Sequence, residues 1–117
     1  MKLLNDSQRQ QLIDNFLFNE TVRGSSEEID YSPVVKLFTP DGSATWLLSE
    51  LEPGTDIAFG LCDLGFGCPE LGSVSLRELE QVRGPLGLPI ERDLHFVPNG
   101  TLSEYATKAR VAGRIVT

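Results

Sequence analysis

The sequence is poor in residues that bind metals or cross-link a small fold. Two cysteines, one histidine, one methionine and one tryptophan occur in 117 residues. The close ligand pairs of a structural zinc site are therefore missing, as are the many cysteines of a disulfide scaffold. No apolar run approaches the roughly 18 residues of a membrane span, and residues 1–6 lack the apolar stretch of a signal peptide. These absences predict a cytoplasmic protein without a membrane segment.

Basic residues are missing from the middle of the chain. The net charge is −7, from 17 acidic and 10 basic residues, and no base occurs between Leu37 and Leu76. Residues 11–76 hold eleven acids against only Arg23 and Lys36, a net charge of −9. Such a field repels a phosphate backbone, so direct nucleic-acid binding is not expected, whereas a basic protein surface is attracted. A solvated acidic surface that aids solubility is the alternative interpretation.

Local patterns predict three helices and a run of strands. The length fits one domain, and 40% hydrophobic with 23% charged residues is typical of a globular chain. Apolar spacing and capping-box residues predict helices over 7–18, 75–83 and 101–113. Ser7 and Gln10 have the capping-box spacing for the first helix. The strand signals predict a β-hairpin over 34–51, strands over 56–64 and 93–97, and a brief pairing at 71–74.

The order of these elements favours an α+β fold. Consecutive strands joined by tight turns pair antiparallel, and helices at the ends of a strand run favour α+β over doubly wound α/β. We expect one α+β domain over residues 1–117, with a small antiparallel sheet of three to five strands and flanking helices. The polar segment 19–32 is expected to be a mobile loop. Strict alternation places Trp46, Leu48 and Glu50 on one face of their strand.

Residues capable of catalysis or metal binding form only weak patterns. Asp56 and Asp63 point to opposite faces of a regular strand, which argues against a shared acid–base role. Cys62 or Cys68 with His95 and an aspartate could form a nucleophilic triad, but a chain of this size commonly holds one of each. We therefore assign no catalytic residue, no metal ligand and no cofactor.

Partner-binding residues are expected along the acidic middle segment. A surface of carboxylates with an apolar anchor suits a partner that carries basic and apolar groups. Phe66, at the tip of a glycine-rich turn, is the candidate anchor. The carboxylates expected to supply charge are Glu50, Glu52, Asp56, Asp63 and Glu70.

Several stretches of the chain resemble one known family. They are Pro33–Pro40, Thr45–Leu48 with Glu50-Leu51, Asp56–Gly65, and Pro69–Gly72 with Val74–Leu76. Together they are similar to an uncharacterised domain-of-unknown-function family of small bacterial proteins, encoded on plasmids, integrative elements and phages, often near anti-restriction genes. The resemblance covers about residues 33–115. It implies a mobile-element context and no assigned activity. Cys68 departs from the pattern, where a larger apolar residue is expected, and 19–32 resembles a local insert.

The charge and the resemblance together predict a non-enzymatic protein. We expect it to inhibit a host defence complex, such as a CRISPR effector or a restriction enzyme, by protein–protein binding through its acidic surface. One alternative is a small enzyme or metal-binding domain acting around Cys62, Asp63, Cys68 and His95. The other is an accessory subunit that self-associates through a sheet edge formed by the hairpin 34–51. A monomer or a homodimer is compatible with these hypotheses.

Overall fold

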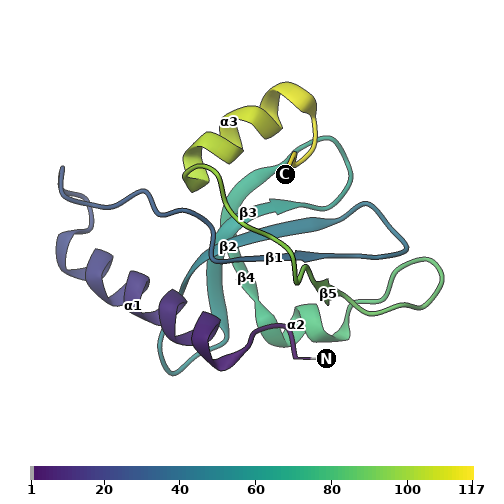
Figure 1. Ribbon diagram of the computed structural model, residues 1–117, viewed down its shortest axis with the longest axis horizontal. Helices are drawn as coiled ribbons and strands as arrows, with labels where there is room; N and C mark the ends of the chain where they lie inside the picture. Colours follow the sequence, from purple (N-terminus) through teal and green to yellow (C-terminus); the bar gives the residue numbers. More distant parts are fainter. Residues whose placement is uncertain (1) are drawn as a thin grey trace.

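The computed structural model describes residues 2–117 and shows one sheet with helices on both sides (Figure 1). The elements in chain order are α1 (Asp6–Val22), β1 (Val35–Phe38), β2 (Thr45–Leu51), β3 (Ile57–Asp63), β4 (Glu70–Ser75), α2 (Leu76–Gln81), β5 (Glu91–Arg92) and α3 (Leu102–Ala112). The sheet has the strand order β4-β3-β2-β1-β5, and every neighbouring pair is antiparallel. The predicted α+β class and five-stranded upper limit are confirmed.

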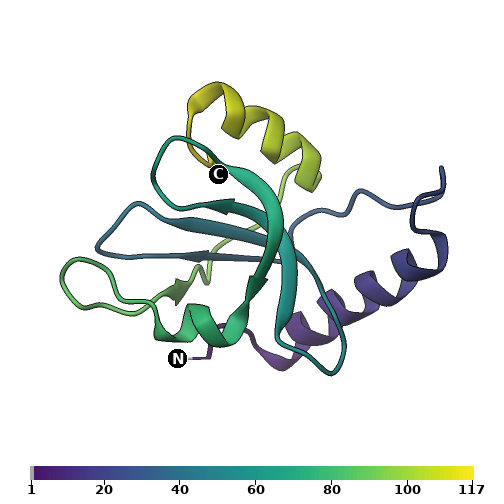
Figure 2. The ribbon, with the colours of Figure 1, turned by 180° about the vertical axis from the view of Figure 1, so that it is seen from behind.

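Helices pack on both faces of the sheet, with α3 on one and α1 and α2 on the other (Figures 1 and 2). The larger core joins residues of α1, α2 and the N-terminal segment to one face, and includes Leu12, Trp46 and Leu48. The smaller core joins α3 to the other face through Leu47 and Leu61. Since β2 is sandwiched between the two cores, all of it except its first residue is buried.

A β-bulge in β2 changes which side chains share a face. The register with β3 shifts between Leu48 and Glu50, so that Glu50 pairs with Phe59. A bulge adds one residue to a strand and so reverses the alternation that follows it. The expectation that Glu50 shares a face with Trp46 and Leu48 is therefore wrong. Glu50 lies on the α3 face, beside Phe59.

Four predictions about these elements need correction. The first helix runs from Asp6 to Val22, four residues beyond the predicted end at 18, and its capping box is formed by Asn5 and Gln8 rather than by Ser7 and Gln10. The predicted strand 93–97 is a turn, and the short strand β5 precedes it at 91–92. The hairpin 34–51 lies inside the sheet, flanked by β3 and β5, so it forms no edge.

Candidate functional site

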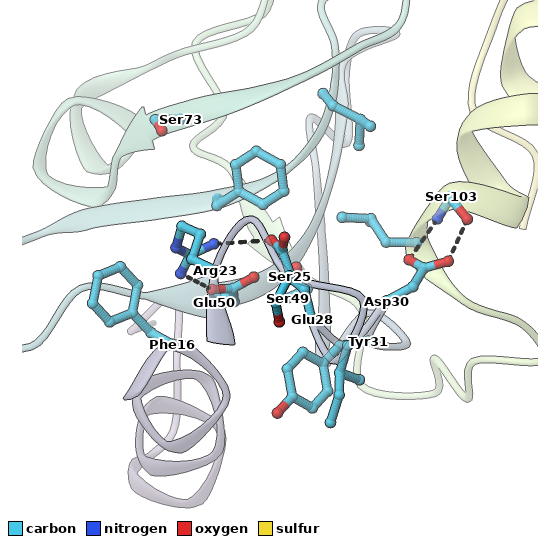
Figure 3. Close-up of a pocket in the computed structure, with 14 residues that line it drawn as sticks. Phe16, Arg23, Ser25, Glu28, Asp30, Tyr31, Ser49, Glu50, Ser73 and Ser103 are labelled. Carbon is cyan, nitrogen blue, oxygen red and sulfur yellow. Dashed lines mark hydrogen bonds and ion pairs between the residues drawn. The ribbon is translucent and has the colours of Figure 1, made fainter. Parts of the chain in front are cut away.

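A groove of about 560 Å³ opens on the α3 face of the sheet (Figure 3). Its floor comes from β2, β3 and β4, and its walls come from the C-terminal half of α1, the segment 25–31 and the start of α3. The groove exists because α3 covers only the part of this face around Leu47 and Leu61. We call it the α1–α3 groove. Its lining residues are Phe16, Arg23, Ser25, Glu28, Ile29, Asp30, Tyr31, Ser49, Glu50, Phe59, Leu71, Ser73, Leu102 and Ser103.

The floor of the groove presents apolar carbon to solvent. Phe59 of β3 and Leu71 of β4 are 36% and 41% exposed, and Ile29 on the wall is 42% exposed. Their neighbour Leu61 on the same sheet face is buried under α3. Exposed large apolar side chains gathered in a hollow are typical of an interaction site rather than of ordinary surface.

Arg23 joins three carboxylates at the α1 side of the groove, two of which, Glu28 and Glu50, are drawn in Figure 3. Its guanidinium nitrogens lie 3.1 Å from Glu50, 3.3 Å from Glu28 and 3.3 Å from Glu20. The guanidinium carbon lies 5.5 Å from the centre of the Phe16 ring, in cation–π range. The hydrogen bond to Glu50 is the main cause that raises the pKa of Arg23. This single cation is therefore already paired within the protein.

The carboxylates outnumber the cations in this groove. Glu28, Asp30 and Glu50 line it against Arg23 alone, which gives three negative charges, one positive charge and a net of −2. A concave, partly apolar wall concentrates the field of such charges. The groove therefore attracts a cationic group, whereas an anionic substrate or a phosphate would be repelled.

A buried amide holds the wall of the groove in place. Asn19 on α1 is 1% exposed; its Oδ1 accepts a hydrogen bond from the N–H of Ile29 at 2.8 Å, and its Nδ2 donates to the carbonyl of Ile29 at 2.9 Å. This two-bond clamp fixes the segment after α1 to the helix itself. The clamp lies at the start of the segment 19–32, whose first four residues belong to α1. The mobility of the remainder stays a prediction.

The same wall segment is also tied to the first turn of α3. Asp30 accepts hydrogen bonds from the backbone N–H of Ser103 at 3.2 Å and from the Ser103 hydroxyl (Figure 3). Burial alone would raise the pKa of Asp30, but the hydrogen bonds from Ser103 and Thr101 outweigh it, and the pKa is lowered. Asp30 thus stays ionised at neutral pH, where it also suits the positive end of the α3 dipole.

Two of the predicted partner-binding acids are buried. Glu50 and Asp63 are 7% and 2% exposed. Asp63 accepts hydrogen bonds from the N–H of Gly65 and of Ile115, both at 2.9 Å, and so fixes the C-terminal segment to the end of β3. The expectation that these acids lie on an open surface is therefore wrong. Glu50 reaches the groove only through the bulge, and Asp63 has a structural role.

The other four predicted residues lie at opposite ends of β3. Glu52 and Asp56 flank the turn before it, whereas Phe66 and Glu70 belong to the turn after it and the start of β4. Six residue steps along β3 separate the two ends by roughly 20 Å. Phe66 is 84% exposed, as the sequence analysis expected, and Asp56 pairs with Arg77 at 3.5 Å. The predicted acids therefore do not form one patch.

The structure does not bring the cysteines and the histidine together. Cys62 packs against the larger core, on the face covered by α1 and α2, while the neighbouring Asp63 accepts a hydrogen bond from the N–H of Ile115 at the end of β3. Cys68 is exposed in the turn before β4, and His95 is exposed in the turn after β5, beyond the opposite edge of the sheet. Burial raises the pKa of Cys62 to about 11, so its thiol is not activated. Residues 2–117 contain no group of three or more His, Cys, Asp or Glu side chains arranged to hold a metal ion.

Sequence reasoning missed the centre of the groove. The sequence pattern predicts a polar loop at Arg23 and Glu28, and it marks Phe59 and Leu71 only as strand residues. The one available signal is the apolar character of both faces of the strand 56–64, in which Phe59 and Leu61 alternate with Ala58 and Gly60.

Among residues 2–117, no helix has the length and apolar character that crossing a membrane requires.

Comparison with known proteins gives one match. The model of a family described as "Protein of unknown function (DUF2958)" matches residues 3–116, nearly the whole chain and more than the stretch 33–115 that carried the resemblance. Neither a search of curated proteins nor a search of solved structures found a match.

Proposed function

Because the chain belongs to the DUF2958 family, whose function is unknown, we propose a function from the groove itself. The protein is a non-enzymatic binding domain that recognises a partner protein through the α1–α3 groove. The partner contributes basic and apolar side chains. The class of partner follows from the mobile-element resemblance, which favours a host defence complex such as a CRISPR effector or a restriction enzyme.

One observation carries this proposal: exposed apolar carbon lies directly beside a surplus of carboxylates. Phe59 and Leu71 form a hollow apolar floor, and Glu28, Asp30 and Glu50 line the same groove. A lysine or arginine side chain matches both features, because its aliphatic stem packs on apolar surface while its charged head stays near carboxylates. Aromatic and aliphatic anchors in a pocket with a polar rim are the usual energetic centre of a protein interface.

The groove supports binding rather than turnover. Its polar groups hold one another: Arg23 pairs with Glu20, Glu28 and Glu50, and Asp30 accepts from Ser103. No histidine, cysteine or lysine lines the groove, and the one carboxylate that meets a serine hydroxyl there, Asp30, is held by the Ser103 backbone N–H as well, which favours a structural role for that pair.

Electrostatic attraction sets the expected salt dependence. A groove of net charge −2, within a protein of net charge −7, steers a basic partner and raises its association rate. Screening is strong above about 0.5 M salt, where the Debye length falls to roughly 4 Å. Partner binding should therefore weaken mainly through a slower association rate as salt is added.

Site-specific photo-crosslinking tests the proposal. We would place a photo-reactive phenylalanine derivative at Leu71 in the groove, and at Val111 as the matched control, because Val111 is 88% exposed on α3 outside the groove. In host lysate at low salt, we expect a basic host protein to cross-link at Leu71 and not at Val111. A Glu28→Lys substitution or 0.5 M salt should abolish the cross-link.

The identity of the captured protein decides the finer part of the proposal. A nuclease or another subunit of a defence complex would support counter-defence, and a basic protein of another kind would support groove binding while removing the defence role. Equal cross-linking at Leu71 and Val111, or none at Leu71 at any salt concentration, would contradict a binding function for the groove.

A further inference from the structure

One edge of the sheet is long and unprotected. The sheet ends at β4 on one side and at the two-residue strand β5 on the other. β4 has six residues, Glu70–Ser75, none of them buried. It contains no lysine, proline or bulge, the usual devices that prevent an edge strand from pairing with another chain. Gly72 at its centre would meet no atom within 4 Å if it carried a Cβ, so the sheet face beside this part of the edge is uncovered.

The free hydrogen-bonding groups of this edge follow from its pairing with β3. The N–H of Leu76 donates to the carbonyl of Asp56 just beyond the paired strands, and antiparallel ladders alternate between bonded and non-bonded residue pairs. Counting back in register, both backbone groups of Leu71 and Ser73 and the N–H of Ser75 point away from β3, while the carbonyl of Ser75, the N-cap of α2, accepts the first bond of that helix. Within the described residues no further strand pairs with them.

The two faces beside this edge have different chemistry. On one face, Leu71 and Ser73 line the α1–α3 groove with its surplus of carboxylates. On the other face, Val74 borders a second hollow of about 420 Å³, whose lining is mainly apolar but also includes Glu78 and two serines; its apolar residues are Trp46, Ile57, Leu64, Val74, Leu79 and Val82. Because successive side chains of a strand point to opposite faces, a strand added to β4 would present alternate residues to an acidic groove and to an apolar hollow.

We propose that β4 binds an extended segment of the partner as a sixth, antiparallel strand, in which basic and apolar side chains alternate. This inference rests on the proposed function and names the form in which the partner is recognised. Backbone hydrogen bonds to Leu71, Ser73 and Ser75 supply affinity, as in other cases of strand addition. The alternating pockets supply specificity. Charge favours a basic partner over a second copy of this chain, whose net charge of −7 and acidic groove would repel the first.

A designed peptide and two methylated forms of it test this proposal on the full chain. The probe is an eight-residue peptide of alternating lysine and valine, with blocked ends. In an antiparallel pair, residues opposite each other share a face, so the lysines that face the groove are the residues whose N–H groups face β4. Methylation of the backbone nitrogens of the lysines blocks the peptide edge that faces β4. Methylation of the backbone nitrogens of the valines leaves that edge free, and the two methylated peptides have the same charge and composition.

The expected result is a difference between these two matched peptides. Backbone methylation at the lysines should weaken peptide binding by on the order of tenfold or more, since it removes several backbone hydrogen bonds. Backbone methylation at the valines should change binding little. In hydrogen–deuterium exchange, the unmodified peptide should protect the amide of Ser73, while Val74, already bonded to β3, should change little. A Ser73→Pro variant removes the outward donor and should lose the peptide, with Ser73→Ala as its control.

Three outcomes would overturn strand addition. They are equal binding of the two methylated peptides, an unchanged Ser73 amide under saturating peptide, and antiparallel dimerisation of the free protein through β4, which would assign the edge to a second copy. Retention of the Leu71 cross-link to a basic partner alongside any of these results would leave the proposed groove function standing, so that the two proposals fail separately.

Discussion

The clamp formed by Asn19 predicts a specific loss when it is cut. An Asn19→Ala substitution removes an amide that is 1% exposed and that pairs with both backbone groups of Ile29. It also removes a longer contact of 3.5 Å to Glu50. The wall of the α1–α3 groove would then lose its attachment to α1, because Ile29 lies on that wall.

The expected loss in the free energy of unfolding of Asn19→Ala follows from the two hydrogen bonds. Each contributes about 1 kcal/mol, and a buried group left without a partner costs about 1–3 kcal/mol. Since Ile29 is 42% exposed, water can reach its freed backbone groups, which places the total near the lower end, at about 2 kcal/mol. For a domain of this size, that loss lowers the melting temperature by roughly 8 °C.

An Asn19→Asp substitution separates the two bonds of the clamp. An aspartate still accepts from the Ile29 N–H but cannot donate to its carbonyl, and it places a second carboxylate next to Glu50, 3.5 Å from the present amide. Like charges at a buried position disfavour each other. We expect Asn19→Asp to be at least as destabilising as Asn19→Ala at pH 7, and to recover part of the stability at pH 4.

Urea unfolding and amide exchange measure the effect, with Gln10→Ala as the control. Gln10 is exposed on the same helix and bonds only to Asp14 there, so its loss should cost less than about 0.5 kcal/mol. The Ile29 amide should exchange faster in Asn19→Ala, less so in Asn19→Asp, which keeps an acceptor for that N–H, and not in the control. If Asn19→Ala unfolds at the same urea concentration as Gln10→Ala, with the Ile29 amide unchanged, the clamp does not hold the wall and the reasoning is refuted.

Three further predictions concern groups that the sequence placed in candidate sites. With a pKa of about 11, Cys62 holds roughly a thousandth of its thiol as thiolate at pH 8, so a thiol reagent should label the exposed Cys68 first; equal rates would contradict the burial of Cys62. An Asp63→Ala substitution leaves the buried N–H of Ile115 unpaired and should cost about 1–3 kcal/mol, with faster exchange of the Ile115 amide, while Glu52→Ala on the exposed turn should cost little. The pKa of Asp30 is lowered in the folded state, so its carboxylate stabilises the fold at pH values above the ordinary aspartate pKa of 3.8, and this contribution is lost as the pH falls through the lower pKa of the folded state. Melting temperatures measured from pH 5 to pH 2 should therefore fall more steeply in the wild type than in Asp30→Asn. Parallel curves would contradict this assignment.

The sheet and its turns could be predicted because their signals are local. Pro40-Asp41-Gly42 and Pro53-Gly54 mark two reverse turns between β-branched and aromatic runs, and such signals depend on a few adjacent residues. The structure has strands on both sides of each turn. The end of α1 could not be predicted in the same way. Its buried face beyond Leu12 consists of the amides Asn15 and Asn19, so no apolar pattern marks the continuation of the helix.

The site could not be predicted because its contacts are long-range. Glu50 is held by Arg23, 27 residues away, and Asp63 by Ile115, 52 residues away. An acid without a visible partner in the sequence is read as a surface charge, since unpaired charges are costly to bury. Both acids in fact have partners, and only the fold shows them. The bulge adds a second error, because one extra residue in β2 moves Glu50 from the face of Trp46 to the face of Phe59.

The same physics explains why the proposed binding surface lies where the sequence pattern is least informative. An acid in the middle segment that accepts hydrogen bonds from buried donors stabilises the fold and does not face a partner. Asp63, which accepts from the N–H groups of Gly65 and Ile115, is an example. A carboxylate surplus that the fold gathers without neutralising it lies where α1, the segment 25–31 and α3 meet over β3 and β4. An unpaired strand edge borders that same groove. Charge, apolar floor and free backbone groups coincide there because α3 leaves the β4 side of its sheet face uncovered, and this is why the groove, rather than the acidic segment as a whole, is the surface to test first.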